Sequence, residues 1–266
     1  MKNKFLKGLV ASFGLVISSI SNAALIYGSD PINFGNPLTV FDTETGTTTN
    51  LGSSVSNLAL AFDSNNSLFG INNTSLYSVD LNNGSTSLIA NGAWGGFSES
   101  ATFDLNNNLL TATSTGLYSV NTSNAATTFL GAFVGHNSYD GISVATTSVD
   151  TILGTYSAGT IFGVDSGKIY VIDPNTLVST FLMSGPASET IAFDAEGNLY
   201  GNDYNNGYYQ LDLLNQNHSF LGGSGHFGSA VYGAYSNQVD VPEPSTLAIF
   251  ALGLMGLASR KIKKHV

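Results

Sequence analysis

The stretch SLFGINNTSLYSVD (residues 67–80) decides the fold, because closely similar patterns return three more times along the chain. Each copy has an apolar and aromatic strand, a polar turn, and a second strand that ends in Asp or Asn. The other copies are LLTATSTGLYSVN (109–121), IFGVDSGKIYVID (161–173) and LYGNDYNNGYYQLD (199–212). Alternation within SLYSVD and KIYVID gives each second strand an inward face of Leu or Ile with Val, and leaves Tyr on the other face.

A further strand precedes most of these pairs, and a fourth apolar patch follows each pair. The preceding strands are LALAFD (58–63), SATFD (100–104) and TIAFD (190–194), and the patches are TSLIA, TTFLG, STFLM and HSFLG. Four short antiparallel strands in about 40 residues predict one blade of a β-propeller. The closing Asp or Asn recurs at intervals of 41, 52 and 39 residues. The long interval predicts about eleven inserted residues around 137–160.

An incomplete fifth copy stands first in the chain. The segment LTVFDTETGTTTNLG (38–52) matches the last two strands of a blade, and ALIYG (24–28) supplies a second strand. The innermost strand is missing, and the leftover segment SAVYGAYS (229–236) could provide it. Pairing the two ends of the chain removes exposed sheet edges. We therefore predict an all-β, five-bladed β-propeller closed by its N- and C-terminal strands; six or seven blades would need further blades hidden in the insertion.

The two ends of the chain predict targeting segments around a body at residues 24–240. Residues 1–23 combine lysines, an apolar run and small residues before Ala23, which predicts a signal peptide and not a retained anchor. The segment 241–266 has a Pro-Glu-Pro motif, an apolar helix and a basic cluster. By the positive-inside bias, that cluster should stay cytoplasmic while the body is translocated.

The charge of the body excludes several classes of partner. Seventeen acids lie between Asp30 and Asp240 against one basic residue, Lys168, so the net charge is about −16. Nucleic acid and anionic membrane surfaces would repel this body, whereas a divalent cation would suit it. The chain has no cysteine, so the fold depends on core burial without disulfides.

The C-terminal segment resembles the PEP-CTERM sorting signal of Gram-negative bacteria, in the order Val-Pro-Glu-Pro-Ser, apolar helix and basic end. That resemblance implies recognition of Pro242, Glu243 and Pro244 by a membrane enzyme, an exosortase, and export alongside exopolysaccharide. It also implies transient inner-membrane anchoring before release to the cell surface or the extracellular space. A plain C-terminal anchor is the alternative.

The channel mouth of the predicted propeller is a candidate metal site. The position just before each innermost strand holds Leu58, Glu99, Asp140, Glu189 and His226. Crowded carboxylates raise their pKa or take up a cation, and oxygen ligands favour Ca²⁺. The phrase IAFDAEGNLYG (191–201) resembles NHL and gluconolactonase-like propellers, and that resemblance implies a metal held by Glu99, Asp140 and Glu189. Solvated loop acids are the alternative, and Asp63, Asp104 and Asp194 are predicted to tighten turns.

Aromatic residues in two loops are candidates for binding a sugar. The loops NGAWGGFSES (91–100) and FVGHNSYDG (133–141) carry Trp94, His136 and Tyr139, and sugar rings stack on exposed flat faces. Packing of Trp94 between blades is the alternative. Because no catalytic motif occurs, we expect a non-enzymatic exported propeller with a binding or structural role. The alternatives are a divalent-metal-dependent lactonase or esterase and a scaffold without a small ligand.

Overall fold

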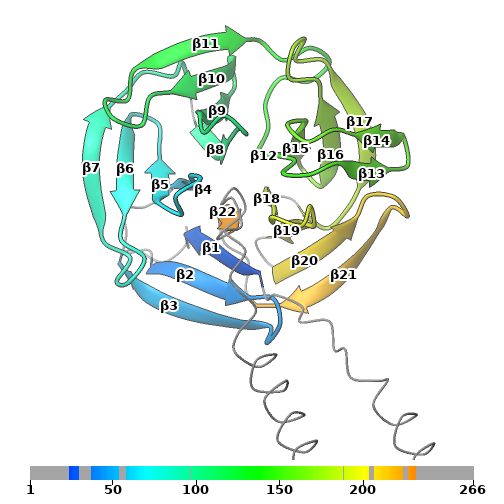
Figure 1. Ribbon diagram of the computed structural model, residues 1–266, viewed down its shortest axis with the longest axis horizontal. Helices are drawn as coiled ribbons and strands as arrows, with labels where there is room; N and C mark the ends of the chain where they lie inside the picture. Colours follow the sequence, from blue (N-terminus) through cyan, green and yellow to red (C-terminus); the bar gives the residue numbers. More distant parts are fainter. Residues whose placement is uncertain are drawn as a thin grey trace, which may run out of the picture.

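The computed structural model describes residues 24–29, 37–53, 58–96, 98–187, 189–203, 207–223 and 227–231. In these residues the chain forms 22 strands, arranged mainly as five four-stranded antiparallel sheets around a central axis (Figure 1). The prediction of an all-β five-bladed propeller is therefore confirmed. The predicted terminal helices, the signal peptide and the sorting segment lie outside the described residues.

The first blade joins the two ends of the propeller. Its strands, from the axis outward, are β22 (Phe227–Val231), β1 (Leu25–Ser29), β2 (Pro37–Asp42) and β3 (Thr47–Ser53). Strand β22 pairs with β1, and Ile26 lies opposite Val231. The predicted closure is confirmed, although the closing strand begins at Phe227, two residues earlier than the apolar pattern indicated.

The second and third blades have four consecutive strands each, as the repeat predicts. The second contains β4 (Ala59–Phe62), β5 (Leu68–Ile71), β6 (Ser75–Val79) and β7 (Thr86–Asn91). The third contains β8 (Ser98–Phe103), β9 (Leu109–Thr113), β10 (Gly116–Val120) and β11 (Thr127–Gly131).

The fourth blade contains the insertion. Its sheet has β12 (Gly141–Val144), β15 (Ile161–Asp165), β16 (Lys168–Ile172) and β17 (Ser179–Ser184), and a separate hairpin of β13 (Val149–Thr151) and β14 (Gly154–Tyr156). The fifth blade follows with β18 (Thr190–Phe193), β19 (Leu199–Asp203), β20 (Gly207–Asp212) and β21 (Asn217–Gly222). The predicted insertion is thus a two-stranded hairpin between the first and second strands of this blade.

The innermost strands contact one another around the axis in the order β22, β4, β8, β12 and β18. Each pairs with a neighbour along one edge, so its other edge must satisfy its backbone groups elsewhere. Hydroxyl groups do so at two places. Val144 N donates to Thr102 Oγ1 at 3.3 Å, and Phe193 N donates to Ser143 Oγ at 3.0 Å. Side-chain hydroxyls therefore link neighbouring blades near the axis.

Most of the carboxylates whose contacts are resolved close turns. Asp63, Asp104 and Asp194 follow the innermost strands and each accept two backbone N–H groups within their own turn. Four further aspartates accept one or two backbone N–H groups in the turn between the third and fourth strands of their blades. These are Asp42, Asp80, Asp173 and Asp212. In blade three, Asn121 occupies this position. Seven of the seventeen acids of the body therefore serve its turns.

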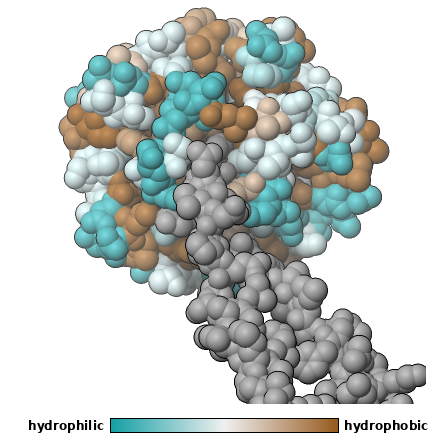
Figure 2. Space-filling model, in the orientation of Figure 1, coloured by the Kyte–Doolittle hydropathy of each residue, from teal (hydrophilic) through white to brown (hydrophobic). Residues whose placement is uncertain are grey.

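The outer strands present a repeated apolar surface. In all five blades the pairing between the third and fourth strands shifts register next to a fixed position, which four blades fill with Tyr. The residues opposite these tyrosines are more than half exposed: Leu88, Phe129, Phe181 and Phe220. On the face seen in Figure 2, hydrophobic residues lie among hydrophilic ones.

Candidate functional site: the channel mouth and a pocket beside the inserted hairpin

Two of the predicted metal ligands lie at the start of neighbouring inner strands. Asp140 immediately precedes β12 and Glu189 immediately precedes Thr190, the first residue of β18. The strands are close here, since a Cβ on Gly141 would lie 2.7 Å from the Cα of Thr190. The carboxylate of Asp140 accepts a hydrogen bond from Ser166 N at 3.2 Å, in the turn between β15 and β16. Asp140 therefore has a partner within its own blade.

Of the other two predicted ligands, Glu99 and His226, the structure describes only the backbone of Glu99. Glu99 is the additional residue at a β-bulge inside β8, between Ser98 and Ser100. Its side chain, like the whole of His226, lies outside what the structure describes. Among the side chains that are described, no three acidic or histidine residues come close enough together to hold a metal ion. The four-residue metal site remains a prediction.

The predicted sugar-binding aromatics do not form an exposed surface. Trp94 is fully buried, and it packs with residues of blades two and three. The absence of a Cβ at Gly92 makes room for the indole ring, since a Cβ there would lie 2.1 Å from Cζ3 of Trp94. The expectation that Trp94 is exposed is wrong, and its alternative, packing between blades, is confirmed.

Tyr139 is also buried, at 3% exposure, in a hydrophobic cluster between blades three and four. Its hydroxyl donates to Ser179 Oγ at 2.5 Å, and burial raises the pKa of Tyr139 to about 12. The ring of His136 stacks on Tyr170 with centroids 4.5 Å apart and meets Tyr139 edge-on. This loop is therefore fixed to the blade by ring packing, and Tyr139 offers no exposed face.

His136 lies next to the carboxylate of Asp165. Its Nε2 lies 3.1 Å from Oδ2 of Asp165 without forming a hydrogen bond, and its side chain is 19% exposed. Because ring packing and the carboxylate occupy most of its surroundings, His136 has little surface left for a ligand. Its predicted role in binding remains untested.

The inserted hairpin creates a pocket that the sequence did not indicate. The hairpin is attached to the fifth blade, where Ile152 N donates to Leu213 O at 3.1 Å. Just before the hairpin in the sequence, Thr146 Oγ1 donates to the carbonyl of Asp194 at 2.6 Å.

A hollow of about 550 Å³ lies between the hairpin and the sheet of blade four. This volume falls within the range of small-ligand sites.

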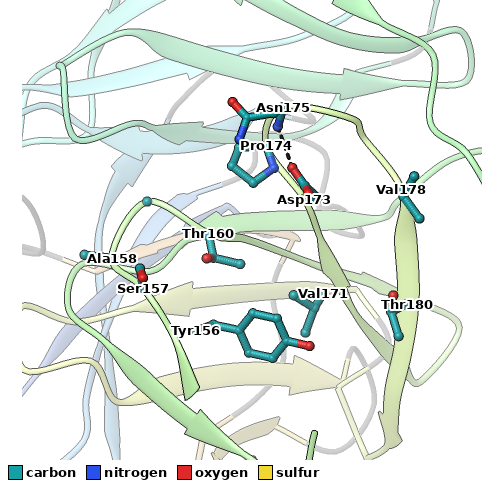
Figure 3. A pocket seen from close by; sticks show the side chains of 11 residues that line it. Tyr156, Ser157, Ala158, Thr160, Val171, Asp173, Pro174, Asn175, Val178 and Thr180 are labelled. Carbon is teal, nitrogen blue, oxygen red and sulfur yellow. Dashed lines mark hydrogen bonds between the residues drawn. The ribbon is translucent and has the colours of Figure 1, made fainter. Parts of the chain in front are cut away.

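The pocket combines an aromatic ring, hydroxyl groups and a carboxylate (Figure 3). Tyr156 from β14 lies at one end and the turn of Asp173 and Asn175 at the other, while Thr180 lies on β17. The remaining lining residues are Ser157, Ala158, Gly159, Thr160, Val171, Pro174 and Val178. Of these, Val171 is buried at 4% exposure and forms part of the core beneath the pocket.

The carboxylate of Asp173 is fixed and ionised. Its Oδ1 accepts hydrogen bonds from Asn175 N at 2.8 Å and Thr176 N at 3.3 Å. The hydrogen bond from the Asn175 backbone is the main reason that the pKa of Asp173 lies below its ordinary value. Near neutral pH this group is therefore a hydrogen-bond acceptor in a fixed position.

A second hollow of about 390 Å³ lies between the hairpin and blade five, on the side opposite to the first hollow. It is lined by Ser148, Val149, Asp150, Gly197, Asn198, Leu199, Gln210, Leu211, Asp212, Leu213 and Ser219. Asp150 is engaged within the hairpin, since its Oδ1 accepts a hydrogen bond from Thr155 Oγ1 at 2.6 Å. The hairpin is thus flanked by a concave surface on both sides, of which the one against blade four is larger.

Comparison with protein families concerns the C-terminal segment. Residues 240–264 match the PEP-CTERM protein-sorting motif, as the order of residues in that segment predicts. The motif is a substrate signal for exosortase, so the chain carries the signal of an exported protein. No helix within the described residues is long and apolar enough to cross a membrane. No curated protein matches the chain.

Comparison with solved structures concerns the body. A nidogen/laminin complex aligns at 11% identity and a TM-score of 0.52, covering 81% of this chain and all of that one. A protein from work on the de novo evolutionary emergence of a symmetrical protein aligns at 16% identity, TM-score 0.49, over 80% of this chain and all of that one. Regucalcin from Agrobacterium tumefaciens, described as calcium-binding, aligns at 17% identity and a TM-score of 0.41, over 69% and 65% of the two chains. The first of these similarities supports the propeller fold and nothing finer.

Proposed function

We propose that this chain is an exported, non-enzymatic β-propeller that acts as a binding or structural module of the cell envelope or exopolysaccharide matrix. The signal peptide would direct the body outward, and the sorting motif would hold it briefly at the inner membrane for an exosortase. Recognition there would rest on Pro242, Glu243 and Pro244.

The observation that carries the binding role is the pocket beside the inserted hairpin. Among the residues that the structure describes, the hairpin occurs in one blade of a repeated scaffold. It borders a concave surface and is not needed to close the ring. Additions of this kind on a rigid scaffold are where proteins commonly place binding residues. Asp173 fits a binding role, because its carboxylate is held by two backbone N–H groups and can accept a hydrogen bond from a ligand.

The proposal is tested by measuring retention and hydrolysis on the same full-length protein, purified in detergent. We expect equal retardation in 1 mM Ca²⁺ and in EDTA on a column of immobilised neutral glycan. We also expect no hydrolysis of gluconolactone or p-nitrophenyl acetate. Metal-dependent turnover of either compound would refute the non-enzymatic role. A scaffold without a small ligand would give neither retention nor turnover.

A divalent-metal-dependent hydrolase remains the second candidate, and the close approach of β12 and β18 favours it. Asp140 and Glu189 immediately precede these two strands, and a cation could bind between them. This candidate predicts that Glu99→Gln and Glu189→Gln abolish turnover and that Ca²⁺ raises the melting temperature, since a ligand of the native state stabilises it. An identical melting temperature in Ca²⁺ and in EDTA would exclude the calcium site.

A further inference from the structure

We propose that the pocket between the inserted hairpin and blade four binds a neutral sugar, recognised by Tyr156, Asp173 and Asn175. This inference rests on the proposed binding role and assigns it a site and a ligand class. None of the aromatic residues that the sequence suggested for sugar binding lines this pocket.

The shape of the pocket suits one or two sugar rings. Its volume of about 550 Å³ lies between a floor that includes Val171 and walls supplied by the hairpin and the 173–175 turn. Tyr156 is half-buried, and its ring packs edge-on against Phe162 with centroids 6.2 Å apart. A ring held from behind in this way offers an oriented apolar surface, which is what the C–H face of a sugar stacks against.

The polar lining distinguishes a sugar from a cation. Hydroxyl groups of a sugar both donate and accept, so they need donors and acceptors together. The pocket supplies both, because Ser157, Thr160 and Thr180 carry hydroxyls and Asn175 carries an amide, beside the acceptor Asp173. A cation would use the acceptors alone and leave the donor groups without a role.

The charge of the protein points to a neutral ligand. The body carries about −16, and Asp173 stands ionised in the pocket. Acidic sugars would meet repulsion from both sources. A neutral sugar avoids this repulsion and still gains a charge-assisted hydrogen bond from its hydroxyl to Asp173, a bond stronger than one between neutral groups.

The test uses full-length protein in detergent with maltose, cellobiose and lactose as probes, and spermidine as a cationic probe. Binding is measured by calorimetry and by saturation-transfer NMR. Asp173→Asn keeps the turn intact, because Asn121 closes the equivalent turn in blade three. The matched control is Asp80→Asn, which makes the same change in the turn of blade two, away from both hollows.

We expect at least one of the three disaccharides to bind the wild type. Asp173→Asn should weaken it by about tenfold or more, the effect of losing a hydrogen bond to a charged group, and Asp80→Asn should leave it unchanged. Tyr156→Leu keeps an apolar side chain but removes the flat ring, and it should weaken binding by a similar factor. The fluorescence of Trp94, the single tryptophan, reports that each variant remains folded.

The outcomes separate this inference from the proposed function. Unchanged affinity in both Asp173→Asn and Tyr156→Leu, with the disaccharide still bound, would overturn the pocket assignment and leave the binding role standing elsewhere on the surface. Binding of spermidine with none of the sugars would overturn the ligand class, and so would binding of neither kind of probe. Metal-dependent hydrolysis would instead refute the proposed function itself.

Discussion

Replacing Asp194 by Ala tests whether the acidic residues of this propeller are structural. Asp194 is 5% exposed, and its Oδ1 accepts hydrogen bonds from Glu196 N at 3.0 Å and Asn198 N at 2.7 Å. Its Oδ2 accepts from Asn198 Nδ2 at 2.7 Å and from the hydroxyl of Tyr200 at 3.2 Å. The substitution would leave four donors without their acceptor in a largely buried turn.

The expected loss follows from the number and burial of these hydrogen bonds. A hydrogen bond to a charged group contributes about 1.5–3 kcal/mol, and water can reach part of an opened turn, so we expect Asp194→Ala to cost about 3 kcal/mol. Asp104 makes the same two backbone contacts in a more exposed turn. There we expect about 1 kcal/mol, similar to the loss of an exposed helix cap.

Urea unfolding followed by Trp94 fluorescence measures both variants with one internal probe. With a urea slope of about 2–3 kcal/mol per molar, Asp194→Ala should lower the midpoint by roughly 1 M, and Asp104→Ala by less than half of that. Asp194→Asn, which retains an oxygen acceptor, serves as the matched control and should fall between wild type and Ala. If Asp194→Ala unfolds at the wild-type midpoint, the structural reading of these carboxylates is wrong.

Three further changes have definite expected results. The pKa of Asp173 is lowered by folding, so its stabilising contribution is present above its unfolded pKa and is lost as pH falls through the lower, folded value; thermal melts below about pH 4 should be less pH-dependent in Asp173→Asn than in wild type, and equal slopes would contradict this. Phe41→Ala removes a ring stacked on Tyr208 across the join of blades one and five, with centroids 4.3 Å apart, and should cost about 3–5 kcal/mol in urea unfolding, whereas a loss below 1 kcal/mol would argue against this packing. Gly141→Ala places a methyl group against the Thr190 backbone and should lower stability by about 1–3 kcal/mol, a result that a melting temperature at or above wild type would contradict.

The repeat made most of the fold predictable. Asx residues that close the turns recur at near-regular intervals, and the strands between them have a fixed pattern of apolar residues, so the number of blades could be counted. The closing strand was harder, because the apolar segment runs past Val231 and its pairing with β1 depends on contact between distant parts of the chain. The position of the insertion followed from one long interval between the turn residues. Its internal hairpin was not predictable, because its strands have only three residues each.

The functional site was much less predictable. Trp94 lies among glycines in a loop, a context typical of an exposed residue, yet Gly92 makes room for its ring between two blades. The pocket forms because the hairpin is attached to blade five while Asp173 and Thr180 belong to blade four, and no local pattern encodes that arrangement. The usable signal was the insertion itself, since it is where one blade departs from the repeat.

Closure of the ring is most directly tested with an engineered disulfide between its first and last strands. Ile26 and Val231 are direct partners in the β1–β22 pair, where the Cα separation of antiparallel neighbours suits a disulfide, and the chain has no other cysteine. Ile26→Cys combined with Val231→Cys, produced in an oxidising compartment, should give a monomer with no free thiol and a reduction-sensitive shift in gel mobility. Two free thiols, or cross-links only between molecules, would contradict a propeller closed by its two ends.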